Sequence, residues 1–441
     1  MVGEWTQTTL EEVADKNGFG LVDGPFGSNL PASCYSEEGV PVIRGSNLTL
    51  GMGRFRADEF VFVSEATAKR LERSLCRPLD IVFTKKGTLG QTGLVPERGK
   101  YDLYVLSSNQ MKLTVDRRLA DPLFVYYFVS SPQSTAKIIR DSEATGVPKT
   151  NVTYLRDFPI LLPPLPEQRS IAHILGSLDD KIELNRRMNE TLEAMARALF
   201  KSWFVDFDPV RAKAEGRDPG LPKHIINLFP DSFEDSELGE IPKGWTVGTL
   251  GDVADHPRRG VQPNEMEATT PYIALEHMPR RCIALSEWDA ADGLESNKFK
   301  FKKGEILFGK LRPYFHKVGI APVDGICSTD IVVVTPRAQE WFGFVLGHVS
   351  SDAFVGHTNA GSTGTKMPRT SWGEMARYVV VIPPEDVAKA FTCQIRPSVE
   401  HIIMSIRESR TLTVLRDTLL PKLISGQLRV KDAERFMERA V

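Results

Sequence analysis

Short turns in both halves of the chain combine Lys or Arg with Ser, Thr, Asn or Tyr, often beside Gly. Arg can donate two hydrogen bonds to guanine, Asn can pair with an adenine edge, and Lys and backbone N–H groups bind phosphates. Any one such turn is more often a solvated loop, but their recurrence in both halves favours contacts to DNA. The candidate DNA-binding residues are Arg44, Ser46, Asn47, Lys85, Lys86, Thr88, Lys149 and Asn151 in the first half, and Arg258, Arg259, Lys310, Arg312, Tyr314, Lys317, Lys366 and Arg369 in the second.

The sequence carries no recognisable catalytic motif. GxxxxGK[ST], GxGxxG, GxSxG and HExxH are absent, and the eight histidines are scattered. A DNA methyltransferase would need an Asn/Asp-Pro-Pro-aromatic motif, whereas the two Pro-Pro pairs here follow Leu162 and Ile382. The neighbouring acids Asp179 and Asp180 fall on an expected helix surface, and we interpret them as solvated charge. We therefore predict that the chain has no catalytic residues.

Charge and cysteine content restrict the class of protein. The chain has 441 residues, with 55 Lys and Arg against 57 Asp and Glu, so a DNA-binding surface must be local. Its five cysteines lie far apart without metal-ligand spacing, which predicts neither disulfides nor a metal site. No apolar run approaches the ~18 residues of a membrane span, and the acidic N-terminus does not resemble a secretory signal. We expect a cytoplasmic protein without membrane contact.

A long internal repeat must position the basic turns. The segment Trp5–Leu10 returns as Trp245–Leu250, and later segments pair at an offset of 220, as Val129–Ser131 does with Val349–Ser351. Loops differ in length between the copies, but the β-branched runs that predict strands persist. The chain therefore contains two copies of one globular domain, each ended by a Pro-Pro pair.

Each Pro-Pro pair is followed by a segment with helical periodicity. In the second copy the apolar stripe runs from Phe391 to Leu423, and Pro397 and Pro421 should kink or restart that helix. In the first copy the stripe steps by three and four residues, close to the heptad seam of a coiled coil. Its members are Ile171, Leu175, Leu178, Ile182, Asn185, Met188, Leu192, Met195 and Leu199.

The expected fold class is α+β, with two repeated globular domains that are each followed by a long helix. The connection between the copies is acidic and punctuated by Pro and Gly, which predicts an irregular linker. The predicted boundaries are residues 1–164 and 245–384 for the globular domains, 165–205 and 385–428 for the helices, 206–244 for the linker and 429–441 for a C-terminal tail.

Several motifs resemble the specificity subunits of type I restriction-modification systems. The closest resemblance lies in Thr145–Asn151, Pro163–Ala172 and Leu178–Asn185. Gly24–Ser28, Leu199–Pro209 and the two-repeat plan are similar to that family as well. The resemblance spans nearly the whole chain, although Pro384–Val387 lacks the Leu-Pro-Glu-Gln run of the first copy.

The resemblance implies two target-recognition domains that each read one half of a split DNA sequence, with the two helices packed antiparallel as a coiled-coil-like spacer. It implies a non-catalytic subunit that recruits two methyltransferase subunits and restriction subunits. S-adenosylmethionine, ATP and Mg then belong to those partners, and this chain holds no cofactor. The candidate partner-binding residues on the first helix are Gln168, Lys181, Arg186, Arg187 and Glu193.

Physical reasoning supports the same design, because paired DNA readers engage two separated half-sites through two-fold symmetry. Two alternatives remain open. The helix stripes could be buried against each other without any partner role. The chain could also be a tandem-domain protein-interaction scaffold without DNA specificity, in which the basic turns are solvated loops.

Overall fold

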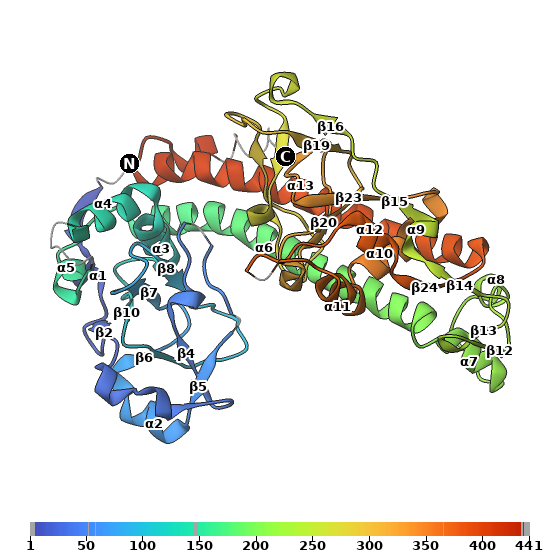
Figure 1. Ribbon diagram of the computed structural model, residues 1–441. Helices are drawn as coiled ribbons and strands as arrows, with labels where there is room; N and C mark the ends of the chain where they lie inside the picture. The colour runs from blue at the N-terminus through green and yellow to red at the C-terminus, as the bar shows by residue number, and fades with distance from the viewer. Residues whose placement is uncertain are drawn as a thin grey trace. The chain divides into compact units, whose positions relative to one another are not determined.

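The computed structural model describes residues 5–51, 53–57, 59–143, 149–364, 366–433 and 435. The chain divides into two compact units, the first built from Met1–Lys181 with Leu412–Val441 and the second from Ile182–Thr411. Each unit contains one sheet-rich domain and a part of each long helix. Figure 1 shows the strands of the first unit in blue to teal and those of the second in light green to orange-red.

The first unit holds two main sheets and a two-stranded ribbon. One sheet is antiparallel throughout, with strand order β2-β10-β7-β8, and the other has the order β3-β5-β4-β9-β6, with β4 and β9 parallel. The ribbon pairs β1 with β11. The strands are β1 (Thr6–Thr9), β2 (Leu21–Asp23), β3 (Tyr35–Ser36), β4 (Val40–Ile43), β5 (Val61–Val63), β6 (Leu75–Cys76), β7 (Ile81–Thr84), β8 (Thr92–Leu94), β9 (Tyr104–Leu106), β10 (Gln110–Leu113) and β11 (Pro159–Leu162).

The second unit repeats this plan. Its sheets have the orders β15-β23-β20-β21 and β16-β19-β22-β17-β18, the pair β17 and β22 is parallel, and β14 pairs with β24. A hairpin, β12-β13, is added. The strands are β12 (Phe233–Ser236), β13 (Gly239–Pro242), β14 (Thr246–Thr249), β15 (Ala254–Asp255), β16 (Gly260–Val261), β17 (Pro271–Ile273), β18 (Asp289–Ala290), β19 (Lys298–Phe301), β20 (Ile306–Gly309), β21 (Val318–Ile320), β22 (Gly325–Cys327), β23 (Ile331–Pro336) and β24 (Val379–Ile382).

Short helices cover the sheets of both units. The helix α3 begins where Asp121 accepts hydrogen bonds from the N–H groups of Leu123 and Phe124, both at 3.0 Å, with Pro122 at its first position. The short helices are α1 (Leu10–Val13), α2 (Glu65–Arg70), α3 (Pro122–Ser130), α4 (Pro132–Glu143) and α5 (Val152–Arg156) in the first unit, and α7 (Asp208–Ala214), α8 (Lys223–Ile226), α9 (Leu250–Val253), α10 (Phe342–Val349), α11 (Asp352–Ala360) and α12 (Trp372–Ala376) in the second.

The repeat extends to individual hydrogen bonds between strands. The N–H of Ser107 donates to the carbonyl of Ile43 at 3.0 Å, and the N–H of Ser328 donates to Ile273 at 2.9 Å. The central strands β7 and β20 are buried along their whole length, which explains why both read as unbroken apolar runs. The predicted α+β fold with a duplicated domain is confirmed.

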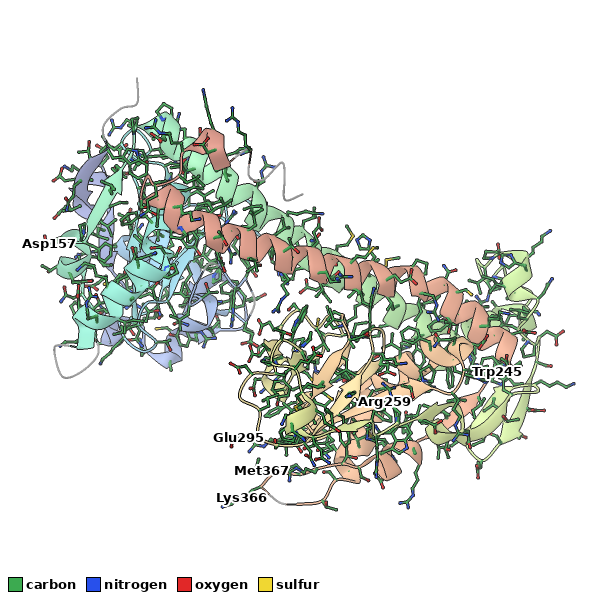
Figure 2. All side chains as sticks on the ribbon, turned by 90° about the horizontal axis from the view of Figure 1, so that it is seen from above. Asp157, Trp245, Arg259, Glu295, Lys366 and Met367 are labelled. Carbon is green, nitrogen blue, oxygen red and sulfur yellow. The ribbon has the colours of Figure 1, made fainter. Side chains whose placement is uncertain are left out.

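The long helices α6 (Leu165–Phe204) and α13 (Glu385–Ile424) lie side by side (Figure 2). In the second unit, Asn185 donates to the Ser409 hydroxyl at 3.2 Å, while Asn189 accepts from the Ser405 hydroxyl at 2.6 Å. The residue numbers rise on one helix and fall on the other, so the predicted antiparallel packing is confirmed. Because Asn185 and Asn189 correspond to Ser405 and Ser409 at the repeat offset of 220, the two contacts are reciprocal, as on a pseudo-twofold axis.

The predicted apolar stripe of the first helix is wrong at Met188 and Met195, whereas Leu192 and Leu199 pack against the core as predicted. Met188 and Met195 are 40% and 61% exposed, whereas Asn189 and Glu193 are 7% exposed. A straight helix turns every 3.6 residues, so a strict 3.5-residue pattern drifts away from the buried face. The buried face also contains polar residues, which a search for apolar spacing passes over.

The second helix does not restart at its prolines. The helix α13 continues through Pro397 and Pro421. The neighbouring residues Ile395, Val399 and Leu423 are at most 4% exposed. Their burial offsets the roughly 3 kcal/mol that an interior proline costs a helix.

The segment between the copies is folded, which corrects the prediction of an irregular linker. The helices α7 and α8 and the hairpin β12-β13 occupy it, and Val210 and Phe229 are buried in the core of the second unit. The ring of Phe229 meets that of Trp203 edge-on at 5.0 Å between centroids. The few apolar residues between the Pro and Gly positions are sufficient to anchor the segment on the core.

Acid should destabilise the second unit through His348, which is buried on α10 with ring centroids 4.9 Å from Phe200 and 4.5 Å from Phe344. Burial lowers the pKa of His348 to about 3, against about 6.5 in an unfolded chain. Below pH 6.5 only the unfolded chain takes up the proton, so stability falls as the pH drops toward 3.

From pH 6.5 to 5 the loss through this one group should be about 2 kcal/mol. Urea unfolding at pH 7 and pH 5 should therefore show a smaller acid-induced loss of stability in His348→Phe than in the parent chain. Equal losses in the two proteins would contradict the assignment.

Candidate nucleic-acid interface

In the first unit, loops from three strands surround a polar hollow of about 550 Å³. Because β4 and β9 are parallel, the loops that follow them leave the sheet at the same edge, beside the turn after β7. Four predicted residues, Arg44, Ser46, Lys86 and Thr88, line it. The other lining residues are Tyr35, Gly45, Thr84, Gly87, Gln91, Ser107, Ser108, Asn109 and Gln110.

Backbone hydrogen bonds hold this loop edge together. The N–H of Lys85 donates to the carbonyl of Asn109 at 2.7 Å, and the N–H of Thr150 donates to the carbonyl of Lys85 at 3.1 Å. An antiparallel bridge joins Lys86 to Lys149. Both bridged lysines are exposed, so two basic side chains start from paired backbone positions beside the hollow, which Lys86 lines. The adjoining motif residues 144–148 lie outside the described part of the chain.

Three of the predicted DNA-binding residues of the first unit form hydrogen bonds or an ion pair within the unit. Asn47 is fully buried, accepts from the N–H of Arg44 at 2.9 Å and donates to the carbonyl of Arg56 at 3.0 Å. Asn151 accepts from the N–H of Tyr154 at the start of α5, and Lys85 pairs with Asp23 at 2.8 Å. The assignment of Asn47 to a base edge is therefore corrected, because its amide is used inside the loop.

Replacing Asn47 by alanine should lower the free energy of unfolding of the first unit by about 1–3 kcal/mol, since it removes a fully buried side chain that bonds the N–H of Arg44 and the carbonyl of Arg56. Chemical denaturation followed by tryptophan fluorescence measures this loss. Asn47→Asp keeps the acceptor and is the matched control, with an intermediate loss. An unchanged stability in Asn47→Ala would contradict the buried role.

The second unit builds the same framework with other side chains. The N–H of Lys310 donates to Asp330 at 2.9 Å, the N–H of Thr370 donates to Lys310 at 3.0 Å, and a bridge joins Leu311 to Arg369. These bonds correspond one by one to those around Lys85. The sequence repeat therefore brings equivalent loops to equivalent places.

Exposed basic and aromatic groups surround this second framework. Lys366 lies at the tip of its loop (Figure 2), and Arg258 is exposed with φ of 44°. Tyr314 is 49% exposed and meets the ring of Phe315 edge-on at 4.8 Å. The guanidinium of Arg312 lies 5.9 Å from the centre of the same ring.

Two predicted residues of the second unit are engaged by internal partners, and a third is partly neutralised. Arg259 binds both carboxylate oxygens of Glu305, whose side chain is 13% exposed. The ammonium of Lys317 donates to the carbonyl of Leu275, and burial lowers its pKa. Both side chains are bound within the unit, so we do not assign Arg259 and Lys317 to the DNA contacts. Arg369 pairs with Asp330 at 3.3 Å but stays exposed.

Sequence reasoning missed part of both loop frameworks. Gln91 and Gln110 line the polar hollow, and Arg280 lies 4.1 Å from the centre of the Phe315 ring. Gln91 directly precedes β8 and Gln110 is the first residue of β10, and neither stands beside a basic residue, so a search for basic turns passed over both. The basic pair Arg280-Arg281 was visible in the sequence and could have been added.

Comparison with known proteins identifies the family. A family model for the type I restriction modification DNA specificity domain matches residues 4–194. The specificity subunit of the type I restriction enzyme MjaVIII from Methanocaldococcus jannaschii is 30% identical over 351 residues, which cover 74% of this chain and 75% of that protein. This chain belongs to the family of type I restriction enzyme specificity subunits.

Other members are similar over most of their length. The specificity subunit of HindI from Haemophilus influenzae is 25% identical over 78% of this chain and 87% of its own, and that of MjaIX from M. jannaschii is 24% identical over 85% of both. The crystal structure of a type I system S subunit from M. genitalium aligns with a TM-score of 0.56 at 16% identity, over 95% of this chain and 96% of that one. This likeness shows that the two share a fold.

The helix residues assigned to partners of a specificity subunit fall into two groups. Lys181, Arg186 and Arg187 are exposed, and both arginines bind Glu183 at 2.7 Å. Gln168 and Glu193 are buried and structural, which corrects their assignment. Gln168 donates to the carbonyl of Pro163 and accepts from the N–H of Asp121, while Glu193 accepts from the N–H of Ile283.

Within the described ranges of this specificity subunit, no three or more His, Cys, Asp or Glu side chains gather where they could hold a metal ion. None of the helices in the described part of the chain has the length and apolar character needed to cross a membrane.

Proposed function

We propose that this chain is the DNA-reading, non-catalytic subunit of a type I restriction-modification complex. Each sheet-rich domain reads one half of a split site. The observation that carries the proposal is the loop framework around Lys85 and Asn109, which recurs around Lys310 and Asp330 with the same hydrogen bonds. Two equal frameworks suit two separated stretches of duplex.

The two half-sites should differ. At equivalent positions the first unit has Lys86 and the second has Leu311, and the bridged partners are Lys149 and Arg369. Different side chains on one backbone framework bind different bases, so the site is asymmetric. The DNA contacts we retain are Arg44, Ser46, Lys86, Thr88 and Lys149 for one half, and Arg258, Lys310, Arg312, Tyr314, Lys366 and Arg369 for the other.

The domain boundaries follow from the same proposal. We assign residues 1–164 and 245–384 to the recognition domains and 165–205 and 385–428 to the spacer helices. We assign the segment 206–244, which packs on the second core, to a folded connection, and 429–441 to a C-terminal tail.

Methyltransferase and restriction subunits would supply the chemistry in the cytoplasm, with S-adenosylmethionine, ATP and Mg bound to them. The exposed face of α6 supports such recruitment. Leu184, Met188 and Met195 are 54%, 40% and 61% exposed on the helix surface. Together with Arg187 they form an apolar strip with a basic neighbour, which is typical of a protein interface.

A mobility-shift assay tests DNA reading directly. The chain, alone and with its methyltransferase subunit, is titrated against mixed-sequence duplex at several salt concentrations. We expect binding that weakens linearly on a log–log scale with salt, and tighter binding with the partner. Binding to protein but to no duplex would favour the tandem scaffold instead.

A further inference from the structure

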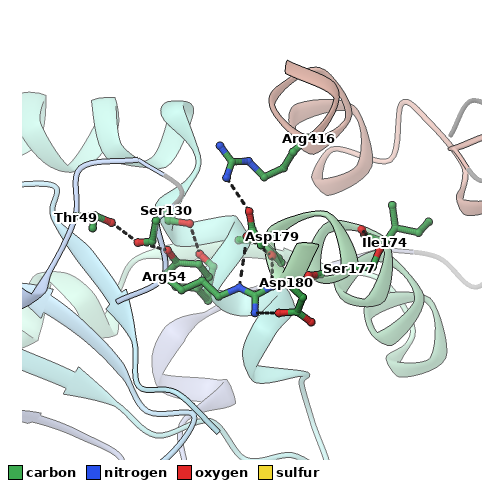
Figure 3. Close-up of polar contacts among 12 residues, drawn as sticks. Thr49, Arg54, Ser130, Ile174, Ser177, Asp179, Asp180 and Arg416 are labelled. Carbon is green, nitrogen blue, oxygen red and sulfur yellow. Dashed lines mark hydrogen bonds and ion pairs between the residues drawn. The ribbon is translucent and has the colours of Figure 1, made fainter. Parts of the chain in front are cut away.

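Arg54 joins the first recognition domain to the helix α6. It lies on the loop after the Gly45–Asn47 turn, and its guanidinium reaches Asp180 at 2.7 Å, the carbonyl of Gly176 at 2.9 Å and the hydroxyl of Tyr127 on α3 at 3.0 Å. Figure 3 shows Arg54 beside the two aspartates of α6. Because the guanidinium is planar, three acceptors in different directions fix its orientation as well as its distance.

The charges around Arg54 are balanced inside the unit. Asp179, with a side chain 8% exposed, lies 3.4 Å from Nε of Arg54 and 2.7 Å from Nη1 of Arg416 on α13. The carboxylate of Asp179 also accepts a hydrogen bond from the hydroxyl of Tyr127. The interpretation of Asp179 as solvated charge is therefore wrong, and one carboxylate links the recognition domain to both long helices.

The backbone beside Arg54 is bonded to the polar hollow. The carbonyl of Arg54 accepts from the N–H of Leu94 at 2.7 Å, and the N–H of Arg56 donates to the carbonyl of Asn47 at 2.9 Å. The hydroxyl of Tyr126 donates to the carbonyl of Gly53 at 3.1 Å. The segment therefore carries the edge of the hollow on one side and the helix anchor on the other.

The second unit is anchored differently. There Glu193 accepts from the N–H of Ile283 at 2.9 Å, and the guanidinium of Arg410 lies 3.9 Å from the centre of the Trp288 ring. The Arg54 anchor is thus specific to the first unit and is not a copied feature of the repeat.

We propose that Arg54 is a positioning residue that holds the reading loops of the first domain at a fixed angle on the two-helix spacer, and so enforces the gap between the half-sites. The inference rests on the proposed DNA-reading function. Arg54 acts through the reading loops and does not itself contact a base. Without the Arg54 anchor, the first domain should still recognise its own half-site but should also accept that half-site at a wrong distance from the other half-site.

The test uses the full chain with its methyltransferase subunit, once sequencing of methylated adenines has given the split motif. Methylation rates are compared on the native duplex, on duplexes with the gap changed by one base pair, and on duplexes with one base of the first half-site changed. Arg54→Met should lower the preference for the native gap about tenfold while keeping the base preference, and Arg54→Lys should rescue part of it.

Two further variants distinguish loss of the Arg54 anchor from unfolding of the domain. Asp180→Asn removes one arm of the anchor at an aspartate that is 73% exposed, and should loosen the gap about threefold. Arg118→Met removes a comparable ion pair at an arginine that is 76% exposed, and should change nothing. Hydrogen exchange, which needs no DNA, should become faster at the amides of Leu94 and Arg56 in Arg54→Met, less so in Asp180→Asn, and should stay unchanged in Arg118→Met.

An unchanged gap preference in Arg54→Met, or equal loss of gap and base preference, would overturn the positioning role. Unchanged hydrogen exchange would overturn it as well. If the parent chain with its partner methylates no split site, the proposed function itself fails, and the exchange result still reports on the anchor.

Discussion

Removing Lys86 and Lys149 together should weaken duplex binding about 10- to 100-fold at low salt and by a similar factor for every sequence. Both lysines are exposed; Lys86 lines the polar hollow, and a backbone bridge pairs Lys149 with it. Exposed ammonium groups bind phosphates and release counterions, so the log–log salt dependence should flatten by about one for each lysine. Fluorescence anisotropy at several salt concentrations measures both effects.

Three single variants make this prediction specific. Lys69→Ala removes an exposed lysine from α2 and is the matched control, with no change in the salt dependence. Lys85→Ala should change it less than Lys86→Ala, because Asp23 already neutralises Lys85 at 2.8 Å. If all these lysines contributed equally, binding would depend on overall charge and the hollow would not be the contact surface.

A half-molecule of residues 1–205 should pair with a second copy of itself much more tightly after its helix end is changed. The reciprocal contacts of Asn185 with Ser409 and of Asn189 with Ser405 show that the helices can pair around a pseudo-twofold axis. Two copies of α6 could therefore replace α6 and α13. Such a dimer would read a palindrome made from the first half-site.

The ends of the two helices are not interchangeable. Phe200, Trp203 and Phe204 of α6 are buried in the aromatic core of the second unit. At the corresponding positions α13 has Leu420, Leu423 and Ile424, which are buried at the first unit. Aromatic rings forced into spaces built for Leu and Ile cost about 1–3 kcal/mol each.

The variant with Phe200→Leu, Trp203→Leu and Phe204→Ile should therefore dimerise at least about 100-fold more tightly than the unmodified fragment. Sedimentation equilibrium measures the dissociation constants, and adenine methylation with the partner subunit reports the palindrome. Two fragments of equal affinity would show that the helix ends do not discriminate. A monomeric triple variant would count against the symmetric design.

The repeat and its main strands could be predicted from the sequence because apolar runs such as Ile81–Phe83 and Ile306–Phe308 are buried along their length. The buried face of the helix pair could not. Asn189 and Glu193 are polar, and their burial depends on Ser405 and on the N–H of Ile283, which lie far away in the chain.

The candidate site shows the same limit. The sequence predicted a group of polar and basic turns in the first copy, and four of the residues it named, Arg44, Ser46, Lys86 and Thr88, line one hollow. The sequence could not show which polar side chains bind other groups within the domain and are therefore not available to DNA. Arg259 meets Glu305, which is 46 positions away, and nothing in the local sequence distinguishes such an arginine from an exposed one.

Adenine-methylation sequencing of a methylation-free host shows whether the two domains of this chain read a split DNA site. The host expresses this chain together with its methyltransferase subunit, and control strains lack one or the other. We expect one split motif with two unlike half-sites and a fixed gap, present only when both proteins are made. Methylation that does not depend on this chain, or that falls on a continuous motif, would contradict this expectation.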